Sequence, residues 1–149
     1  MKALHVFVLC VAMATSAATG LAADTIGAVL TPYFRIQSAL VDDRVDTIKN
    51  DALIVAQEAG NLGAPGKPIE DAATALSQAT EIGEAREAFG RLSDAVIGYA
   101  DSTRISPGDD VATVYCPMVK KSWLQKNGDV KNPYFGKAMP NCGEKKKVG

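Results

Sequence analysis

The sequence predicts a mostly α-helical fold class, in which a small antiparallel bundle of about four helices precedes a compact C-terminal segment of strand and loop. Two observations support this prediction. Apolar residues recur every three or four positions between residues 26 and 100, which is the helical period. After residue 102 the chain becomes rich in proline, glycine and aromatic residues, and one β-branched, alternating run favours a strand.

The N-terminal residues have the order of a secretory signal peptide. Lys2 is followed by the apolar run Val6–Met13 and then by small residues up to residue 23. The run is shorter than the about 20 apolar residues that a membrane-spanning helix needs. We therefore expect a signal peptide over residues 1–23, an exported mature domain over residues 24–149, and no membrane insertion of the mature chain. An uncleaved N-terminal anchor or a buried first helix is the alternative.

Four helices are expected in the first part of the mature chain, each with one apolar stripe. Three glycines and a proline between residues 60 and 67 indicate a loop that divides the helices into two pairs. The expected helices start and end near residues 26 and 41, 44 and 59, 69 and 79, and 81 and 100. Because these stripes end at residue 100, residues 24–102 are expected to fold as a bundle without the rest. Arg86 is expected to be a solvated or ion-paired surface residue.

The C-terminal segment, residues 103–149, is expected to hold one short strand and several turns. Val111–Cys116 alternates and is β-branched, as strands are. Asn132-Pro133 favours a turn, and Gly136 supplies the backbone freedom that such a turn needs. Trp123, Tyr134 and Phe135 are expected to be core residues.

Removal of the signal peptide would leave 126 residues with two cysteines, two methionines and no histidine. Ser-His-Asp and Cys-His catalytic groups, histidine-rich zinc sites and Cys-x-x-Cys-His haem attachment are therefore excluded. No acid–base pair or activated nucleophile is visible, so no enzyme activity is predicted. The net charge of −1 implies no attraction to nucleic acid.

All four sulfur side chains of the mature chain lie in two pairs, Cys116 with Met118 and Met139 with Cys142. Residues i and i+2 of an extended strand share a face, and residues i and i+3 of a helical turn or a tight turn are neighbours, so each pair could hold an ion between its two sulfur atoms. Thiolate and thioether donors without imidazole suit a soft ion such as Cu(I). These four residues are therefore the candidate metal ligands, with Cu(I) as the bound ion.

A disulfide between Cys116 and Cys142 is the competing prediction. Cysteines in an oxidising compartment tend to pair, and closing this loop would stabilise the segment by roughly 3 kcal/mol. The methionines would then be core residues. Free buried thiols are a third alternative, and the residues alone leave all three open.

The same segment resembles a known family. The run Tyr115-Cys116-Pro117-Met118, followed by Trp123-Leu124, Asn132-Pro133-Tyr134-Phe135-Gly136, Met139 and Cys142-Gly143, is similar to the motif of the periplasmic family numbered 3347 among the domains of unknown function (DUF3347). The similarity extends over the mature chain and departs at Pro140, where a leucine would be expected. The family occurs alone or attached to the periplasmic adaptor subunits of heavy-metal efflux pumps.

The resemblance implies a role in handling copper or another soft metal, with Cys116, Met118, Met139 and Cys142 at the matching positions. Two functions are thus expected. The first is a periplasmic Cu(I) carrier or buffer that passes its ion to an efflux adaptor. The alternative is a structural or interaction module of the envelope, in which a Cys116–Cys142 disulfide stabilises the C-terminal segment and the helical bundle binds another envelope protein.

Overall fold

The computed structural model describes residues 18–146, with side chains from Ile26 onward, and confirms the mostly helical fold class. Most of the expected signal peptide, residues 1–17, lies outside the described residues. The helices and strands, in chain order, are α1 (Ala18–Val41), α2 (Ile48–Gly60), η1 (Ala64–Gly66), α3 (Lys67–Leu76), α4 (Ile82–Thr103), β1 (Val111–Cys116), β2 (Lys121–Lys126), η2 (Gly136–Ala138) and β3 (Glu144–Lys145).

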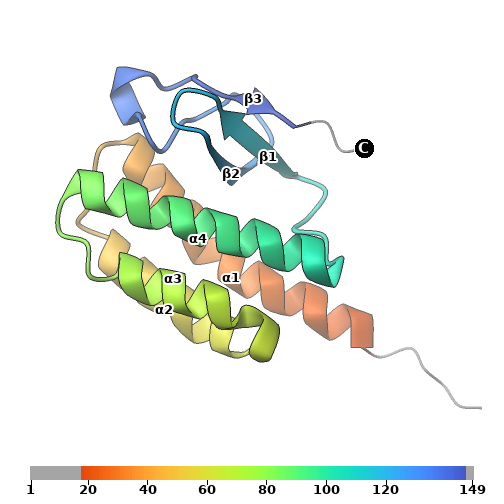
Figure 1. Ribbon diagram of the computed structural model, residues 1–149. Coiled ribbons are helices and arrows are strands. Elements are labelled where there is room, and N and C mark those ends of the chain that lie inside the picture. The colour runs from red at the N-terminus through yellow and green to blue at the C-terminus, as the bar shows by residue number, and fades with distance from the viewer. Residues whose placement is uncertain (1–17, 147–149) are drawn as a thin grey trace, which may run out of the picture.

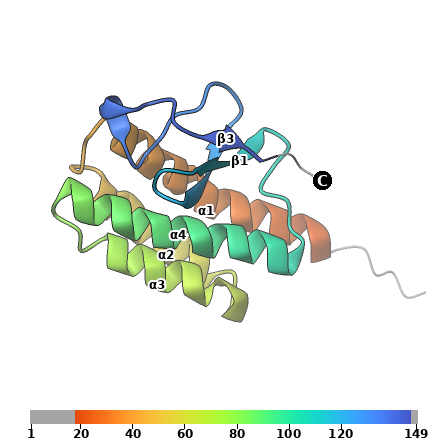
Figure 2. The same ribbon diagram turned by 45° about the horizontal axis from the view of Figure 1, so that its top comes forward.

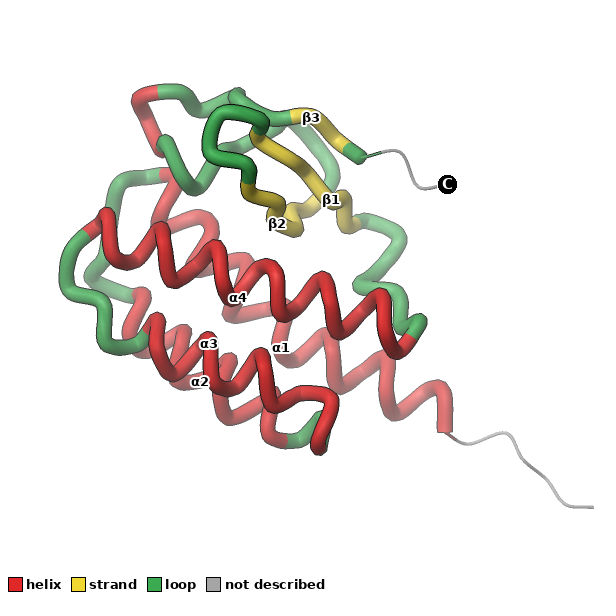
Figure 3. The backbone as a smooth tube through the Cα atoms, viewed as in Figure 1, coloured by secondary structure: helices red, strands yellow, loops and turns green. Residues whose placement is uncertain are grey.

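The four helices lie beneath a small antiparallel sheet with strand order β2-β1-β3 (Figures 1 and 2). Helices α1 and α4 lie next to the sheet, and α2 and α3 pack on the side away from it (Figure 3). Within the described residues no helix combines the length and the apolar character needed to cross a membrane.

The helices form where the apolar period predicts them. The residues spaced by three and four along each helix are the ones that become buried, and they include Val29, Ile36, Leu40, Val55, Leu76, Phe89, Leu92 and Val96. Helix α1 begins eight residues before its expected start at residue 26, and the other boundaries differ from the expected ones by no more than four residues. Asp43 follows α1 in the left-handed conformation, with φ of 59°, which aspartate tolerates better than most residues.

The C-terminal segment contains more regular structure than the sequence indicates. The expected strand Val111–Cys116 is present as β1, but β2 and β3 were not predicted. In β2, Trp123, Leu124 and Gln125 are all buried, so the strand lacks the alternation of a half-exposed strand. Two apolar residues between polar ones give no period-two pattern that would indicate a strand.

The hydrophobic core is shared between the helices and the sheet, so the core of the helices is not separate from the rest of the chain, contrary to what was expected for residues 24–102. Trp123 and Tyr134 are core residues, as predicted. Val114, Trp123 and Leu124 belong to the same buried cluster as the helix stripes. Tyr33 of α1, which is fully buried, joins the two parts, since its hydroxyl oxygen accepts the Leu124 N–H at 3.1 Å and lies 2.7 Å from Ser93 Oγ. Burial raises the pKa of Tyr33, so this hydroxyl remains neutral. The sheet is therefore part of the folded core.

Candidate functional site

Strand pairing brings the two cysteines together across 26 residues of chain. Strand β3 pairs with β1 in antiparallel register, with Tyr115 opposite Glu144. Continuing this register by one residue places Gly143 opposite Cys116, and Cys142 directly precedes it. A Cβ atom on Gly143 would lie 2.7 Å from Trp123 Cη2, so glycine allows this crossing to lie close over the tryptophan ring.

The two cysteines are free thiols in contact. Their Sγ atoms are 2.9 Å apart, which is longer than the about 2.05 Å of a disulfide bond. It is also shorter than the about 3.5–4 Å that separates two thiolates on one tetrahedral metal. Cys116 is fully buried and Cys142 is half-buried, so an approaching ion or oxidant reaches Cys142 first.

The two thiols are not electrostatically equivalent. Burial opposes ionisation of the Cys116 thiol, but hydrogen bonds from the Cys142 thiol, the Val119 and Met118 backbone amides and the Asn132 side chain together lower its pKa. The pKa of the Cys142 thiol is raised, first because that thiol donates its hydrogen bond to Cys116 and then by burial. Of the two thiols, Cys116 is therefore the one that ionises more readily, with Cys142 as its hydrogen-bond donor.

Met118 does not lie as the sequence predicts. Strand β1 ends at Cys116, and Met118 lies in the turn that follows, so the expected extended Cys-Pro-Met arrangement is wrong. Pro117 has no N–H to continue the strand pairing, which favours a turn at this point. The side chain of Met118 is 63% exposed, whereas Met139 is half-buried.

Met139 and Cys142 lie in a tight turn, which is one of the two expected arrangements, and not in a helical turn. The Cys142 N–H donates to the Met139 carbonyl at 3.3 Å, but Met139 itself has φ of −145° and ψ of 71°, outside the helical region. In the described part of the chain, no hydrogen bond joins either thioether sulfur to a thiol. The structure thus brings the two cysteine sulfurs into contact. Each methionine lies in the same turn as one cysteine or in the turn next to it, but its sulfur is not bonded to a thiol in the part of the chain described.

The loop between β2 and Cys142 is held by a buried asparagine. The Asn132 carboxamide oxygen accepts the backbone N–H groups of Tyr134 at 2.7 Å and Phe135 at 3.1 Å, and its Nδ2 donates to the Cys142 carbonyl at 2.5 Å. The sequence marks Asn132-Pro133 as a turn but does not indicate these contacts. The only sequence signal for them is the tendency of asparagine to bond to the backbone two residues on.

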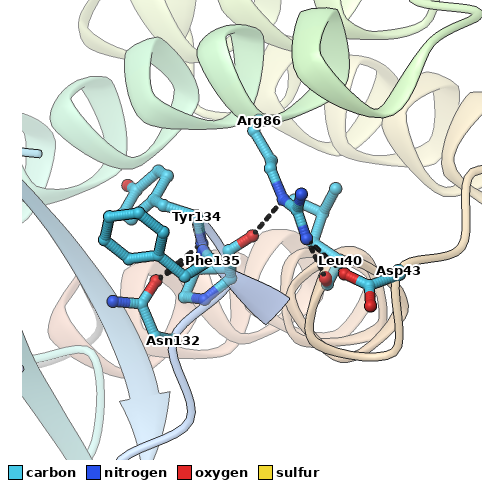
Figure 4. Close-up of polar contacts among 7 residues, drawn as sticks. Leu40, Asp43, Arg86, Asn132, Tyr134 and Phe135 are labelled. Atoms are coloured by element: carbon cyan, nitrogen blue, oxygen red, sulfur yellow. Dashed lines mark hydrogen bonds and ion pairs between the residues drawn. The ribbon is translucent and has the colours of Figure 1, made fainter. Parts of the chain in front are cut away.

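Arg86 of α4 ties this loop to the helices (Figure 4). Its Nε donates to the Pro133 carbonyl at 3.0 Å, and its Nη2 donates to the Leu40 carbonyl at 3.2 Å and to Asp43 Oδ1 at 2.5 Å. Only 19% of its side chain is exposed. An ion pair was one of the expected surroundings of Arg86, but its burial was not expected. Gly136 has φ of 53°, and a Cβ there would overlap Asp43 Oδ1 and Arg86 Nη2. Glycine therefore lets the loop pack against the ion pair.

The Asp43–Arg86 ion pair predicts a loss of stability in acid. The hydrogen bond from Arg86 holds the pKa of Asp43 below its ordinary value of 3.8. A carboxylate with a lowered folded-state pKa stabilises the fold above its unfolded-state pKa, and this contribution is lost as the pH falls through the folded-state pKa. Asp43→Asn should therefore melt at a lower temperature than the wild type at about pH 6, with the difference shrinking towards about pH 2.5.

Thermal melts of both proteins across this pH range test the prediction. Asp46→Asn is the matched control, because Asp46 is 66% exposed and lies 3.7 Å from Arg44. This control should follow the wild-type pH dependence. A constant difference between Asp43→Asn and the wild type at all pH values would contradict the assignment to this ion pair.

Two surface hollows among the described residues lie away from the cysteines. One of about 560 Å³ lies between α1 and the loop after β2, and one of about 530 Å³ lies between the end of α4 and β1. Neither is lined by Cys116, Met118, Met139 or Cys142. In residues 18–146, no group of three or more His, Cys, Asp or Glu side chains is placed to hold a metal ion.

Comparisons with protein-family models, with curated proteins and with solved structures gave no match for this chain.

Proposed function

We propose that the protein is a periplasmic Cu(I)-binding protein that acts as a carrier or buffer for metal efflux. Cys116 and Cys142 are the principal ligands, and Met118 and Met139 complete the site. The observation that carries the proposal is the pair of free thiols in contact, Cys116 and Cys142, at one end of the sheet. Thiolates are soft donors, and Cu(I) is a soft ion that accepts two or three of them.

The chemistry of the donors fits this ion. Hydrogen bonds at Cys116 favour its thiolate form, and a metal ligand must be deprotonated. The sulfur atoms need to move apart by only about 1 Å to reach the spacing of two ligands on one ion. The exposed Met118 follows Cys116 by two residues, so its thioether is available to an arriving ion or to an acceptor protein.

Membership of the DUF3347 family is part of the same proposal, as are the signal peptide over residues 1–23, a mature domain over residues 24–149 and an antiparallel arrangement of its helical bundle. A heavy-metal efflux adaptor is the proposed recipient of the ion. The support for these points is the motif from Tyr115 to Gly143, together with the charge, apolar and small-residue order of the N-terminus.

The second candidate is a structural or interaction module of the envelope in which Cys116 and Cys142 form a disulfide. The same observation favours it, because thiols 2.9 Å apart need little movement to bond covalently. The first candidate needs both cysteines reduced, whereas the second needs them joined in a disulfide. A disulfide sulfur is a poor metal ligand, so oxidation and Cu(I) binding must exclude each other.

An anaerobic titration of the mature protein with Cu(I) separates the candidates. We expect the reduced protein to take up one ion per chain, the oxidised protein to take up none, and reductant to restore binding. A competing Cu(I) chelator with a visible absorbance gives the affinity, and the mass of the intact protein gives the stoichiometry. If the fully reduced protein forms no one-to-one complex, the copper proposal is wrong and the disulfide module takes its place.

A further inference from the structure

Asn132 lies next to the sulfur site, which consists of Cys116 and Cys142. It is fully buried, although it is polar, and it lies in the loop that leads from β2 towards Cys142. One hydrogen of its amide group donates to the Cys142 carbonyl at 2.5 Å. A weaker hydrogen bond from the same side chain contributes to the lowered pKa of the Cys116 thiol. Asn132 thus contacts both cysteines, which lie on different segments of the chain.

The hydrogen bonds fix the orientation of this side chain. A carboxamide has two donor hydrogens and an acceptor oxygen with two lone pairs. The oxygen accepts from Tyr134 and Phe135, and the nitrogen faces the two cysteines. Exchanging the oxygen and the nitrogen would break all of these contacts, so one orientation is selected.

The backbone of Asn132 is held as firmly as its side chain. Its N–H donates to the Pro140 carbonyl at 2.7 Å, and its carbonyl accepts the Gly136 N–H at 3.1 Å. The next residue, Pro133, is bound to Arg86 of α4. Asn132 is therefore held on both sides within its own loop, and a hydrogen bond to the adjacent Pro133 connects that loop to α4.

We infer that Asn132 is a positioning residue of the sulfur site, whose amide nitrogen holds Cys142 against Cys116 so that the two sulfurs act together on one ion or one bond. This inference deepens the proposed function and rests on it for the copper measurement alone. A purely structural role would use the other half of the side chain, the oxygen that shapes the turn.

Asn132→Asp separates these two roles. The carboxylate keeps the oxygen that accepts from Tyr134 and Phe135, so the turn retains its hydrogen bonds. It has no hydrogen to donate to the Cys142 carbonyl or to Cys116. A carboxylate oxygen then lies against the Cys142 carbonyl oxygen, and both are hydrogen-bond acceptors. Asn132→Ser removes the same donors without adding a charge, and it serves as the second variant if the first does not fold.

Gln125→Glu is the matched control. Gln125 is 3% exposed, its oxygen accepts from Trp123 Nε1 and from the Lys131 N–H, and its Nε2 donates to the Asp129 carbonyl at 2.9 Å. The substitution therefore makes the same chemical change in the same part of the fold. Gln125 lies opposite Ala112, four residues along β1 from Cys116, or about 13 Å at the rise of a strand.

The copper-independent test is the rate at which the disulfide closes. Cys142 is the accessible sulfur; once its thiol has lost its proton to solvent, the sulfur attacks oxidised glutathione, which forms a mixed disulfide and releases one glutathione thiolate. The Cys116 thiolate then attacks the Cys142 sulfur, so that the Cys116–Cys142 bond forms, the bond to glutathione breaks and a second glutathione thiolate leaves. The protein loses two electrons and the glutathione disulfide gains them. Acid quenching and intact mass follow both species over time.

We expect Asn132→Asp and Asn132→Ser to slow closure by about 10- to 100-fold, because misplacing one reactant by about 1 Å has this effect. The mixed disulfide should then accumulate, whereas Gln125→Glu should close at the wild-type rate. Wild-type closure in the Asn132 variants would overturn the inference. Equal slowing in Gln125→Glu would also overturn it, because the effect would then come from general destabilisation.

The copper measurement addresses the same residue separately. Loss of a residue that orients a metal ligand typically lowers metal affinity by about 10- to 100-fold, and we expect this for Asn132→Asp in the anaerobic titration. Unchanged affinity in that variant, with wild-type protein that binds Cu(I), would overturn the inference for the metal. A wild type that binds no Cu(I) would refute the proposed function alone, because the closure rates would still decide the role of Asn132.

Discussion

Replacing Cys116 or Cys142 by serine should lower the affinity for Cu(I) by more than about 100-fold, beyond the effect of losing an outer partner of a ligand. Met118→Leu and Met139→Leu should lower it by less than about 10-fold. The charged thiolate is the stronger soft donor, whereas a thioether is neutral and mainly completes the coordination. The structure supports this order, since the two thiols are in contact and Met118 is 63% exposed. Competition with a Cu(I) chelator under anaerobic conditions measures all four affinities.

Of the two cysteine variants, Cys142→Ser tests the loss of a ligand with less disturbance of the fold. Cys142 is half-buried, so its hydroxyl replacement is readily solvated, whereas Cys116 is fully buried among the amides of Met118 and Val119. Circular dichroism should show that both variants keep the wild-type fold, because serine accepts the same hydrogen bonds as cysteine. If either serine variant bound Cu(I) as tightly as the parent, the thiol pair would not be the metal site.

The helices were predictable because each has a long apolar stripe. The predicted strand β1 was also correct, since Val111–Cys116 alternates and contains β-branched residues. Strand β2 was missed because Trp123, Leu124 and Gln125 are buried in succession, with lysines at both ends. Strand β3 has two residues, too few to give any period. Short strands buried on both faces depend on their neighbours for their structure, and a local pattern does not contain that information.

The site was predictable in its residue types but not in its geometry. The concentration of sulfur between Cys116 and Cys142 marks the segment, but the side on which each sulfur lies depends on where β1 ends and on the pairing of β3. The role of Arg86 was equally hidden. A single arginine on a helix normally indicates a surface, and here its acceptors are carbonyls from two distant segments, Leu40 and Pro133. Such contacts exist only after the chain has folded.

A chain that ends after Arg104 should fail to fold cooperatively, which reverses the expectation from the apolar stripes. The truncation removes Val114, Trp123, Leu124 and Tyr134 from the core and exposes the faces of α1 and α4 that they cover. Burying each large apolar side chain contributes about 1.5–3 kcal/mol. Losing several of them together approaches the about 5–15 kcal/mol by which a whole domain is stable. The buried Tyr33 hydroxyl would also lose the Leu124 N–H that it accepts.

Far-UV circular dichroism and urea unfolding measure the outcome. We expect a weakened helical signal without a sigmoidal urea transition in the truncated chain. A chain that ends after Lys146 keeps every described residue and should unfold as the full-length mature protein does. Leu124→Ala, in an otherwise intact chain, should lower the free energy of unfolding by about 2–5 kcal/mol, since Leu124 is 1% exposed in the shared core. If the Arg104 truncation unfolds cooperatively with the full helical signal, the helices form an independent core and the sheet is only attached to it.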